Sequence, residues 1–204
     1  MNKSQLLILM IPVVLFSLTA HEYSHGRIAF LLGDNTAQRL GRLSFNPLKH
    51  LDPIGTLFFY FMGFGWAKPV PVDPGNFDRP RRDMMYVAIA GPLCNLVLAV
   101  ACSFFIRIIE PYDSWVLFTL LSFGVYINVA LAIFNLLPIH PLDGGQIFGG
   151  YIQKISPSFS ERLRTDGPKV LFAIIILGYI TGHSIIWYLI SPFHELVAIM
   201  AGIR

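Results

Sequence analysis

A pentad of polar residues, His21-Glu22-Tyr23-Ser24-His25, lies inside an apolar run that covers residues 6–32. In a helix the two histidines are one turn apart on one face, where both imidazoles can hold a single Zn²⁺. Glu22, beside the first histidine, is placed to take a proton from a water at such a metal. Ionisable side chains are costly within a bilayer, so in a run long enough to cross one they are functional candidates. The pentad therefore predicts hydrolytic chemistry inside a membrane.

The overall composition is that of a membrane protein. Hydrophobic residues make up 54% of the 204 residues and charged residues only 13%, and the mean hydropathy is +0.61. These values lie outside the range of soluble globular domains. We expect one polytopic membrane domain over residues 1–204, with no appended soluble module and no cleavable signal peptide, because the first apolar run is too long for one. The net charge of +3 gives no indication of nucleic-acid binding.

Four apolar stretches are long enough to cross a bilayer as helices. A shorter helix is expected over residues 142–155, and a C-terminal stretch over 193–203 is too short to span. The predicted fold is therefore an all-α, multi-pass transmembrane bundle. The four expected spans cover residues 6–32, 84–109, 115–134 and 169–190.

The segment between the first two spans, residues 34–83, has a different composition. It is rich in Pro, Gly, Asn and Asp and contains only short apolar pieces. The Gly63–Trp66 and Pro69–Pro71 stretches favour extended or turn structure. We predict a small β-hairpin or a re-entrant loop here, buried in protein or lining a wet cavity, because irregular backbone at membrane depth needs such surroundings.

The basic residues predict the orientation. They gather in two segments, 34–83 and 154–169, whereas the opposite side carries little beyond Lys3 and Arg107. Basic loops face the cytoplasm. The two segments share one side if the third span and the 142–155 helix together make a single crossing. We therefore predict a protein of the cell membrane with its N-terminus outside and the pentad toward the cytoplasmic half of the bilayer.

A hydrolytic zinc site has three protein ligands and a water, so the pentad leaves one ligand to find. Asp143 is the candidate, because it follows a polar, proline-broken stretch, residues 135–142, in the middle of apolar sequence. It can also be read as a helix N-cap, where Asp is favoured. The pentad has its own simpler reading, a pair of buried, hydrogen-bonded histidines.

Three motifs in the same order give the chain a family resemblance. They are the pentad, Gly91-Pro92-Leu93-Cys94-Asn95, and a third that runs from Asn135 through Pro138 and Pro141 to Asp143-Gly144. Together they resemble the site-2 proteases, zinc metalloproteases that cleave the transmembrane segments of other proteins. The match covers about residues 5–155, which would form the catalytic core, followed by C-terminal helices over about 169–203. The chain resembles the minimal members of that family.

The resemblance implies a role for each motif residue. His21, His25 and Asp143 would bind one Zn²⁺ per chain, and Glu22 would be the general base. Asn95 and Asn135 would be polar neighbours that orient the substrate backbone or stabilise the oxyanion.

One position departs from the family pattern. His140 stands where a proline is common, and it could be an alternative ligand or a partner of one.

The implied function is intramembrane proteolysis of single-span membrane proteins. An unwound substrate could add as a strand along residues 56–72, where Gly63 and Gly65 leave room for a second backbone. Two other classes stay open: a membrane transporter that binds metal ions, and a catalytically idle relative that only binds substrates.

Overall fold

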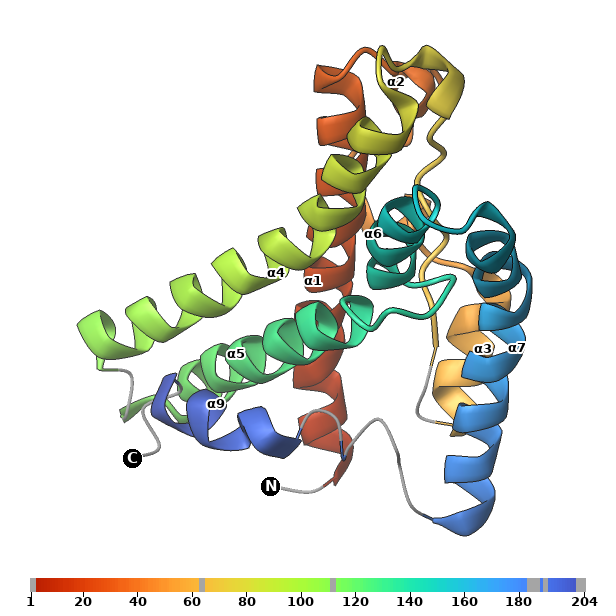
Figure 1. Cartoon of the computed structure of the whole chain (residues 1–204). Helices are drawn as coiled ribbons and strands as arrows, with labels where there is room; N and C mark the ends of the chain where they lie inside the picture. The colour runs from red at the N-terminus through yellow and green to blue at the C-terminus, as the bar shows by residue number, and fades with distance from the viewer. Residues whose placement is uncertain (1–2, 63–64, 111–112, 183–187, 189–190, 201–204) are drawn as a thin grey trace.

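The chain folds into a bundle of helices (Figure 1). The computed structural model describes residues 3–62, 65–110, 113–182, 188 and 191–200. The long helices are α1 (Lys3–Leu31), α4 (Pro80–Ile109), α5 (Trp115–Asn135) and α7 (Pro157–Thr181). The short ones are α2 (Thr36–Arg39), α3 (Pro53–Met62), α6 (Asp143–Ile152) and α9 (His194–Met200), with 3-10 turns η1 (Pro47–Lys49), η2 (Pro74–Asn76) and η4 (Ser191–Phe193).

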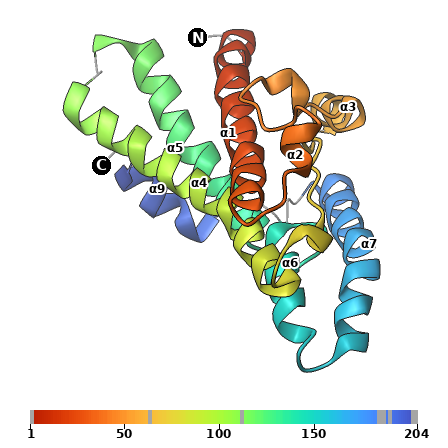
Figure 2. The same ribbon diagram turned by 90° about the horizontal axis from the view of Figure 1, so that it is seen from above.

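Helix α4 is the hub of the bundle. It contacts α1, α5 and α6, while α7 packs on α6 and α9 packs on α5. Seen from above, α1 lies between the α4–α5 pair on one side and α3 on the other (Figure 2). This arrangement brings the middle of α1 and the middle of α4 against the start of α6, which is where the three sequence motifs meet.

The packing of α4 is typical of a helix in lipid. Most of its buried positions are small or polar, among them Ala88, Gly91 and Asn95. Small residues let helix backbones approach closely where lipid supplies no hydrophobic drive for association. By length and composition, α4 and α5 are both able to cross a membrane. Large apolar side chains at three- and four-residue spacing stay exposed along one face of α4: Tyr86, Ile89, Leu93, Val97, Val100, Phe104 and Ile108.

The expected helices are found, with shifted ends. The spans predicted at 6–32, 84–109 and 115–134 correspond to α1, α4 and α5. Helix α4 starts earlier than predicted because Pro80 occupies its first turn, a position that proline favours. The helix predicted at 142–155 is α6. The span predicted at 169–190 begins earlier, as α7, and its last part includes residues outside those described.

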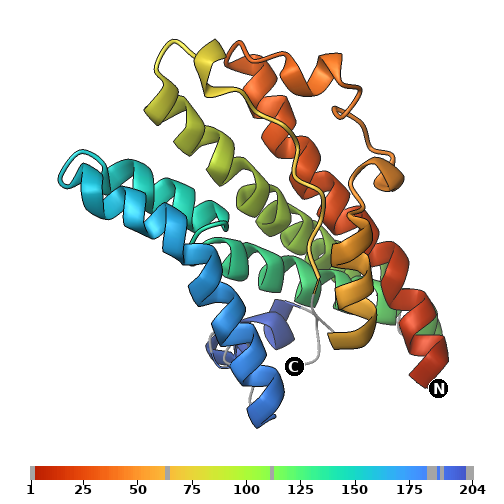
Figure 3. The ribbon, with the colours of Figure 1, turned by 90° about the vertical axis from the view of Figure 1, so that its right-hand side faces the viewer.

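The predicted β-hairpin between the first two spans is not supported. Within the described part of this segment the only β pairing is an isolated antiparallel bridge between Leu51 and Ala67. Residues 53–62 instead form α3, because Asp52 caps it: the Asp52 carboxylate accepts the Gly55 N–H at 2.8 Å and Pro53 takes the first helical position. The chain then returns without helix over 65–73, beside α3 (Figure 3).

Asp34 ties this segment to the end of α1. Its carboxylate is 0% exposed and accepts four hydrogen bonds. They come from the N–H and hydroxyl of Thr36, at 3.0 and 2.5 Å, and from the Asp73 N–H and the Asn76 amide, each at 2.8 Å. Burial raises the pKa of Asp34, but these bonds lower it more, so that it lies below its ordinary value of 3.8.

We predict that Asp34→Ala lowers the free energy of unfolding by about 3 kcal/mol at neutral pH, because it leaves several buried donors without an acceptor. Asp78→Ala, at an exposed carboxylate, is the control. Because the pKa of Asp34 is lower in the folded state, its ionised carboxylate stabilises the fold at pH values above the unfolded pKa. The difference in free energy of unfolding between the native protein and Asp34→Ala should therefore shrink as the pH falls below about 4. Denaturant unfolding in detergent at several pH values measures it, and equal losses in both variants would refute the anchoring role.

Candidate metal centre

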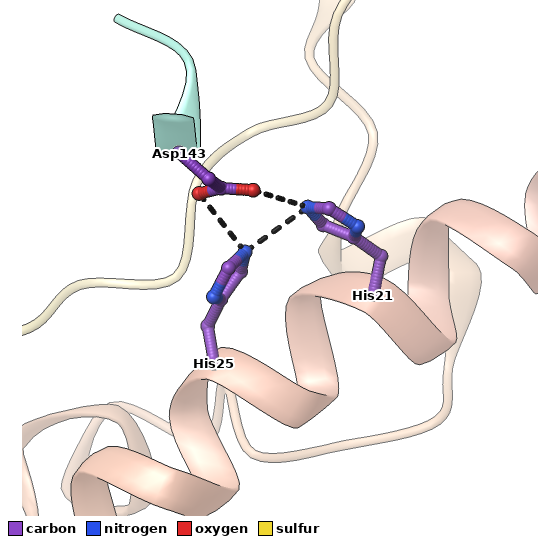
Figure 4. Close-up of side chains that lie close together, drawn as sticks. All are labelled: His21, His25 and Asp143. Carbon is purple, nitrogen blue, oxygen red and sulfur yellow. Dashed lines mark hydrogen bonds and ion pairs between the residues drawn. The ribbon is translucent and has the colours of Figure 1, made fainter. Parts of the chain in front are cut away.

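Helix α1 presents His21 and His25 on one face, one turn apart, as the spacing predicts (Figure 4). Both are buried, at 5% and 9% exposure, and their Nε2 atoms lie 3.0 Å apart. Each Nδ1 atom meets an oxygen of α4. His25 Nδ1 is 2.7 Å from the Val87 carbonyl, and His21 Nδ1 is 2.5 Å from the Asn95 amide oxygen.

Asp143 reaches the same point from the start of α6. Its two carboxylate oxygens lie 3.2 Å from His21 Nε2 and 3.4 Å from His25 Nε2 (Figure 4). The N-cap residue of α6 is Leu142, so Asp143 is not the N-cap, although its charge suits the first turn of a helix. Gly144 and Gly145 follow because a Cβ at either would collide with the main chain of residues 136–140.

Three sets of lone pairs therefore converge on one buried point. A carbonyl only accepts, so the proton of a neutral His25 sits on Nδ1, and its Nε2 turns a lone pair toward His21 and Asp143. Asp143 Oδ2 is buried without a hydrogen-bond donor among the described residues. The three ligand atoms lie within 4.8 Å of one another. Two imidazoles and a carboxylate are ligands that Zn²⁺ accepts at hydrolytic sites, so the residues fit the expected metal.

Gly91 leaves the space that such an ion requires. A Cβ atom at this position would collide with Nε2 of His25 and lie 2.6 Å from Nε2 of His21. Any side chain on this turn of α4 would occupy the point where the lone pairs meet. The glycine of the second motif is thus explained by the site itself.

Glu22 is held by the returning segment. Its Oε2 accepts the N–H of Val70 at 2.8 Å. Because Pro69 and Pro71 have no N–H, Val70 supplies the only main-chain donor of this tripeptide, and Glu22 uses it. Val70 is itself buried. The carboxylate beside the imidazoles is therefore positioned by backbone rather than by another side chain.

The expected edge for strand addition is largely occupied. The Lys68 N–H donates to the His50 carbonyl, and Arg42 donates to the carbonyls of Lys68 and Pro69. Gly65 precedes this stretch without regular structure, and Gly63 lies outside the described residues. Any free edge in the described segment is therefore shorter than the sequence suggested.

Asn95 and Asn135 have different surroundings. Asn95 is 0% exposed, with its amide oxygen beside His21 and its amide nitrogen bonded to Asn128 and Ser17. Asn135 ends α5 and donates to the carbonyl of Leu131. Of the two, Asn95 is the one that hydrogen-bonds to a residue of the trio.

His140 does not join the trio. Among the described residues, the group that could hold a metal is His21, His25 and Asp143. The main chain and Cβ of His140 pack against Gly167 of α7, and its imidazole Nε2 lies beside Gly149 of α6.

Three residues that hydrogen-bond to residues of the site were not predicted from the sequence. Asn128 is an amide in the interior of the apolar helix α5, and polar residues in such helices are functional candidates. That signal could have identified it. Val70 and Val87 act through their main chains, for which no side-chain pattern exists.

Comparison with known proteins also points to a zinc metalloprotease. A model of peptidase family M50 matches residues 106–178, which include Asp143. The chain is 34% identical to "Putative zinc metalloprotease YwhC" of Bacillus subtilis, over 89% of this chain and 85% of that protein. It is 28% identical to "Putative zinc metalloprotease Rip2" of Mycolicibacterium smegmatis, over 89% and 70%. "Zinc metalloprotease MJ0392" of Methanocaldococcus jannaschii is 31% identical over 56% of this chain and 33% of that protein. No solved structure matches significantly.

We predict that Gly91→Ala abolishes zinc binding, because its methyl group would occupy the point where the imidazoles meet. Gly150→Ala is the matched control, since its Cβ would meet the flexible side chains of Met85, at 3.2 Å, and Arg81, at 3.9 Å. Zinc content per chain and helical circular dichroism of both variants measure the effect. A Gly91→Ala protein that keeps its zinc would show that the metal does not bind between these residues.

Proposed function

The chain belongs to peptidase family M50, and from this we propose that it is a zinc-dependent endopeptidase that cuts transmembrane segments of single-span membrane proteins. One observation carries the proposal: two imidazoles and a carboxylate converge in the buried centre of a membrane protein, with a glutamate next in sequence to the first imidazole. Two imidazoles and a carboxylate form the ligand set of a hydrolytic zinc site, and the glutamate is the general base that the reaction requires.

Each residue of the site has a defined task in this reaction. His21, His25 and Asp143 would hold Zn²⁺, which when bound supplies Lewis acidity and lowers the pKa of a water. Glu22 takes the proton of the attacking water on its carboxylate and passes it to the departing amide nitrogen. The Val70 N–H fixes one oxygen of that carboxylate, leaving the other to exchange the proton. Asn135 is a candidate to hold the substrate main chain.

The substrate must reach the site unwound, because amides bonded within a helix are shielded from attack. The Gly65–Ala67 stretch is the remaining candidate for strand addition, along the edge that the bridge between Ala67 and Leu51 leaves open. The Gly55–Trp66 approach is tight, since a Cβ on Gly55 would collide with the Trp66 carbonyl. A substrate strand would therefore add on the side of this stretch away from α3.

The charge distribution supports the orientation that the sequence predicted. Arg79, Arg81, Arg82 and Lys154 line one cavity of about 450 Å³ at the start of α4. The N-terminus of the chain lies at the far end of α1 from this region (Figure 1). Clustered basic residues favour the cytoplasmic side, so we place the start of α4 in the cytoplasm and the N-terminus outside the cell membrane.

The two other classes have less support. A transporter needs polar groups that an ion can reach at successive depths, but Asn95, Asn128 and Ser17 are bonded to one another. An idle relative would lack Glu22 or a ligand, and all four residues are in place.

We predict that Glu22→Gln lowers cleavage of a single-span substrate in proteoliposomes by about 10²–10⁴-fold, the usual contribution of a general base, while one zinc per chain is retained. Glu161→Gln is the matched control, because Glu161 is exposed and pairs with Arg164 on α7. Cleavage and zinc content are measured on the same preparations. Undiminished cleavage by the Glu22→Gln protein would remove Glu22 from the reaction.

A further inference from the structure

A chain of buried amides connects α5 with the imidazole of His21. The Asn95 Nδ2 donates to Asn128 Oδ1 at 2.7 Å, and Asn128 Nδ2 donates to the carbonyl of Gly124 at 2.8 Å and to the Ser17 hydroxyl at 2.9 Å. Asn128 is 2% exposed. Unbonded amides are costly in such surroundings, and every one of these groups has a partner.

The Gly124 carbonyl determines which groups donate and which accept in this series of hydrogen bonds. A carbonyl can only accept, so the Asn128 group that faces it must be the NH₂ group. The oxygen of Asn128 then faces Asn95 and accepts from it. The Ser17 carbonyl, 3.4 Å from Asn95 Nδ2, favours the same orientation of Asn95.

The orientation of Asn95 in turn determines the tautomer of His21. With its NH₂ group turned to Asn128, Asn95 can offer His21 only an oxygen, at 2.5 Å from Nδ1. A neutral His21 must then carry its proton on Nδ1, and its Nε2 turns a lone pair toward His25 and Asp143. His25 is fixed in the same tautomer more directly, by the Val87 carbonyl. The two imidazoles are thus prepared for a metal by different means.

We infer that Asn128 is a positioning residue: by orienting Asn95 it holds His21 in the tautomer that can bind the metal. This rests on the proposed zinc site. Partners behind a ligand typically change metal affinity by about 10–100-fold when removed. The Ser17 hydroxyl is not needed to orient the Asn128 amide, because the Gly124 carbonyl alone fixes that orientation.

A double-mutant cycle tests this inference. Asn128→Leu should weaken zinc binding by about 10–100-fold, because only the long 3.4 Å contact with the Ser17 carbonyl then opposes a turn of the Asn95 NH₂ group toward His21. A carboxylate at position 95 offers His21 an oxygen in either orientation, so in the Asn95→Asp background the same Asn128→Leu change should cause no further loss. Ser17→Ala, the matched control, should leave zinc affinity unchanged. Asn128→Ala replaces Asn128→Leu in the cycle if the leucine variant does not fold.

A second measurement reads the tautomer without metal. Nitrogen-15 NMR of the metal-free, histidine-labelled protein, assigned with a His21→Gln variant, should show His21 protonated on Nδ1 in the native chain and a mixture of tautomers in Asn128→Leu. An equal loss of zinc affinity in both backgrounds, or an unchanged tautomer, would overturn the inference. If the native protein binds no zinc, the proposed function fails, but the tautomer measurement still decides the role of Asn128.

Discussion

The structure depends on one arrangement that would be unfavourable by itself. Two imidazole Nε2 atoms lie 3.0 Å apart and face a carboxylate in the interior of the bundle. Lone pairs and negative charge brought together in a low dielectric repel one another unless a proton or a metal cation lies between them. The surrounding residues hold them there: Val87 and Asn95 fix the rings from behind, and Gly91 leaves the space in front. The fold thus holds three groups together where a bound metal cation would offset their repulsion.

The bilayer explains why so much of the bundle serves this site. Lipid does not drive helices together, so they meet through small residues and buried hydrogen bonds, while large apolar side chains face outward. Three of the buried polar residues in the helices, Ser17 on α1, Asn95 on α4 and Asn128 on α5, are hydrogen-bonded to one another, and Asn95 connects them to His21. Stability and chemistry use the same residues, and Asn128 illustrates this.

The sequence could predict those helices and site residues whose arrangement follows from local spacing or from a motif shared with a known family. The one-turn spacing of His21 and His25 follows from the helix, and the apolar runs located α1, α4 and α5. Asp143 was found because prolines and polar residues interrupt apolar sequence before it. Helix α3 was missed because the apolar, glycine-flanked stretch outweighed the Asp52-Pro53 start signal. The Val70–Glu22 bond joins a backbone group to a side chain 48 residues away, and no local pattern carries such information.

The most direct test of the central claim is X-ray absorption spectroscopy at the zinc edge of the purified, active protein. The structure predicts two imidazole nitrogens and one carboxylate oxygen from the protein, with any further ligand a light atom and no sulfur. A third imidazole would mean that another histidine, such as His140, takes the place of Asp143. A sulfur ligand would mean that Cys94 or Cys102 binds the metal. Either result would contradict a site built from His21, His25 and Asp143.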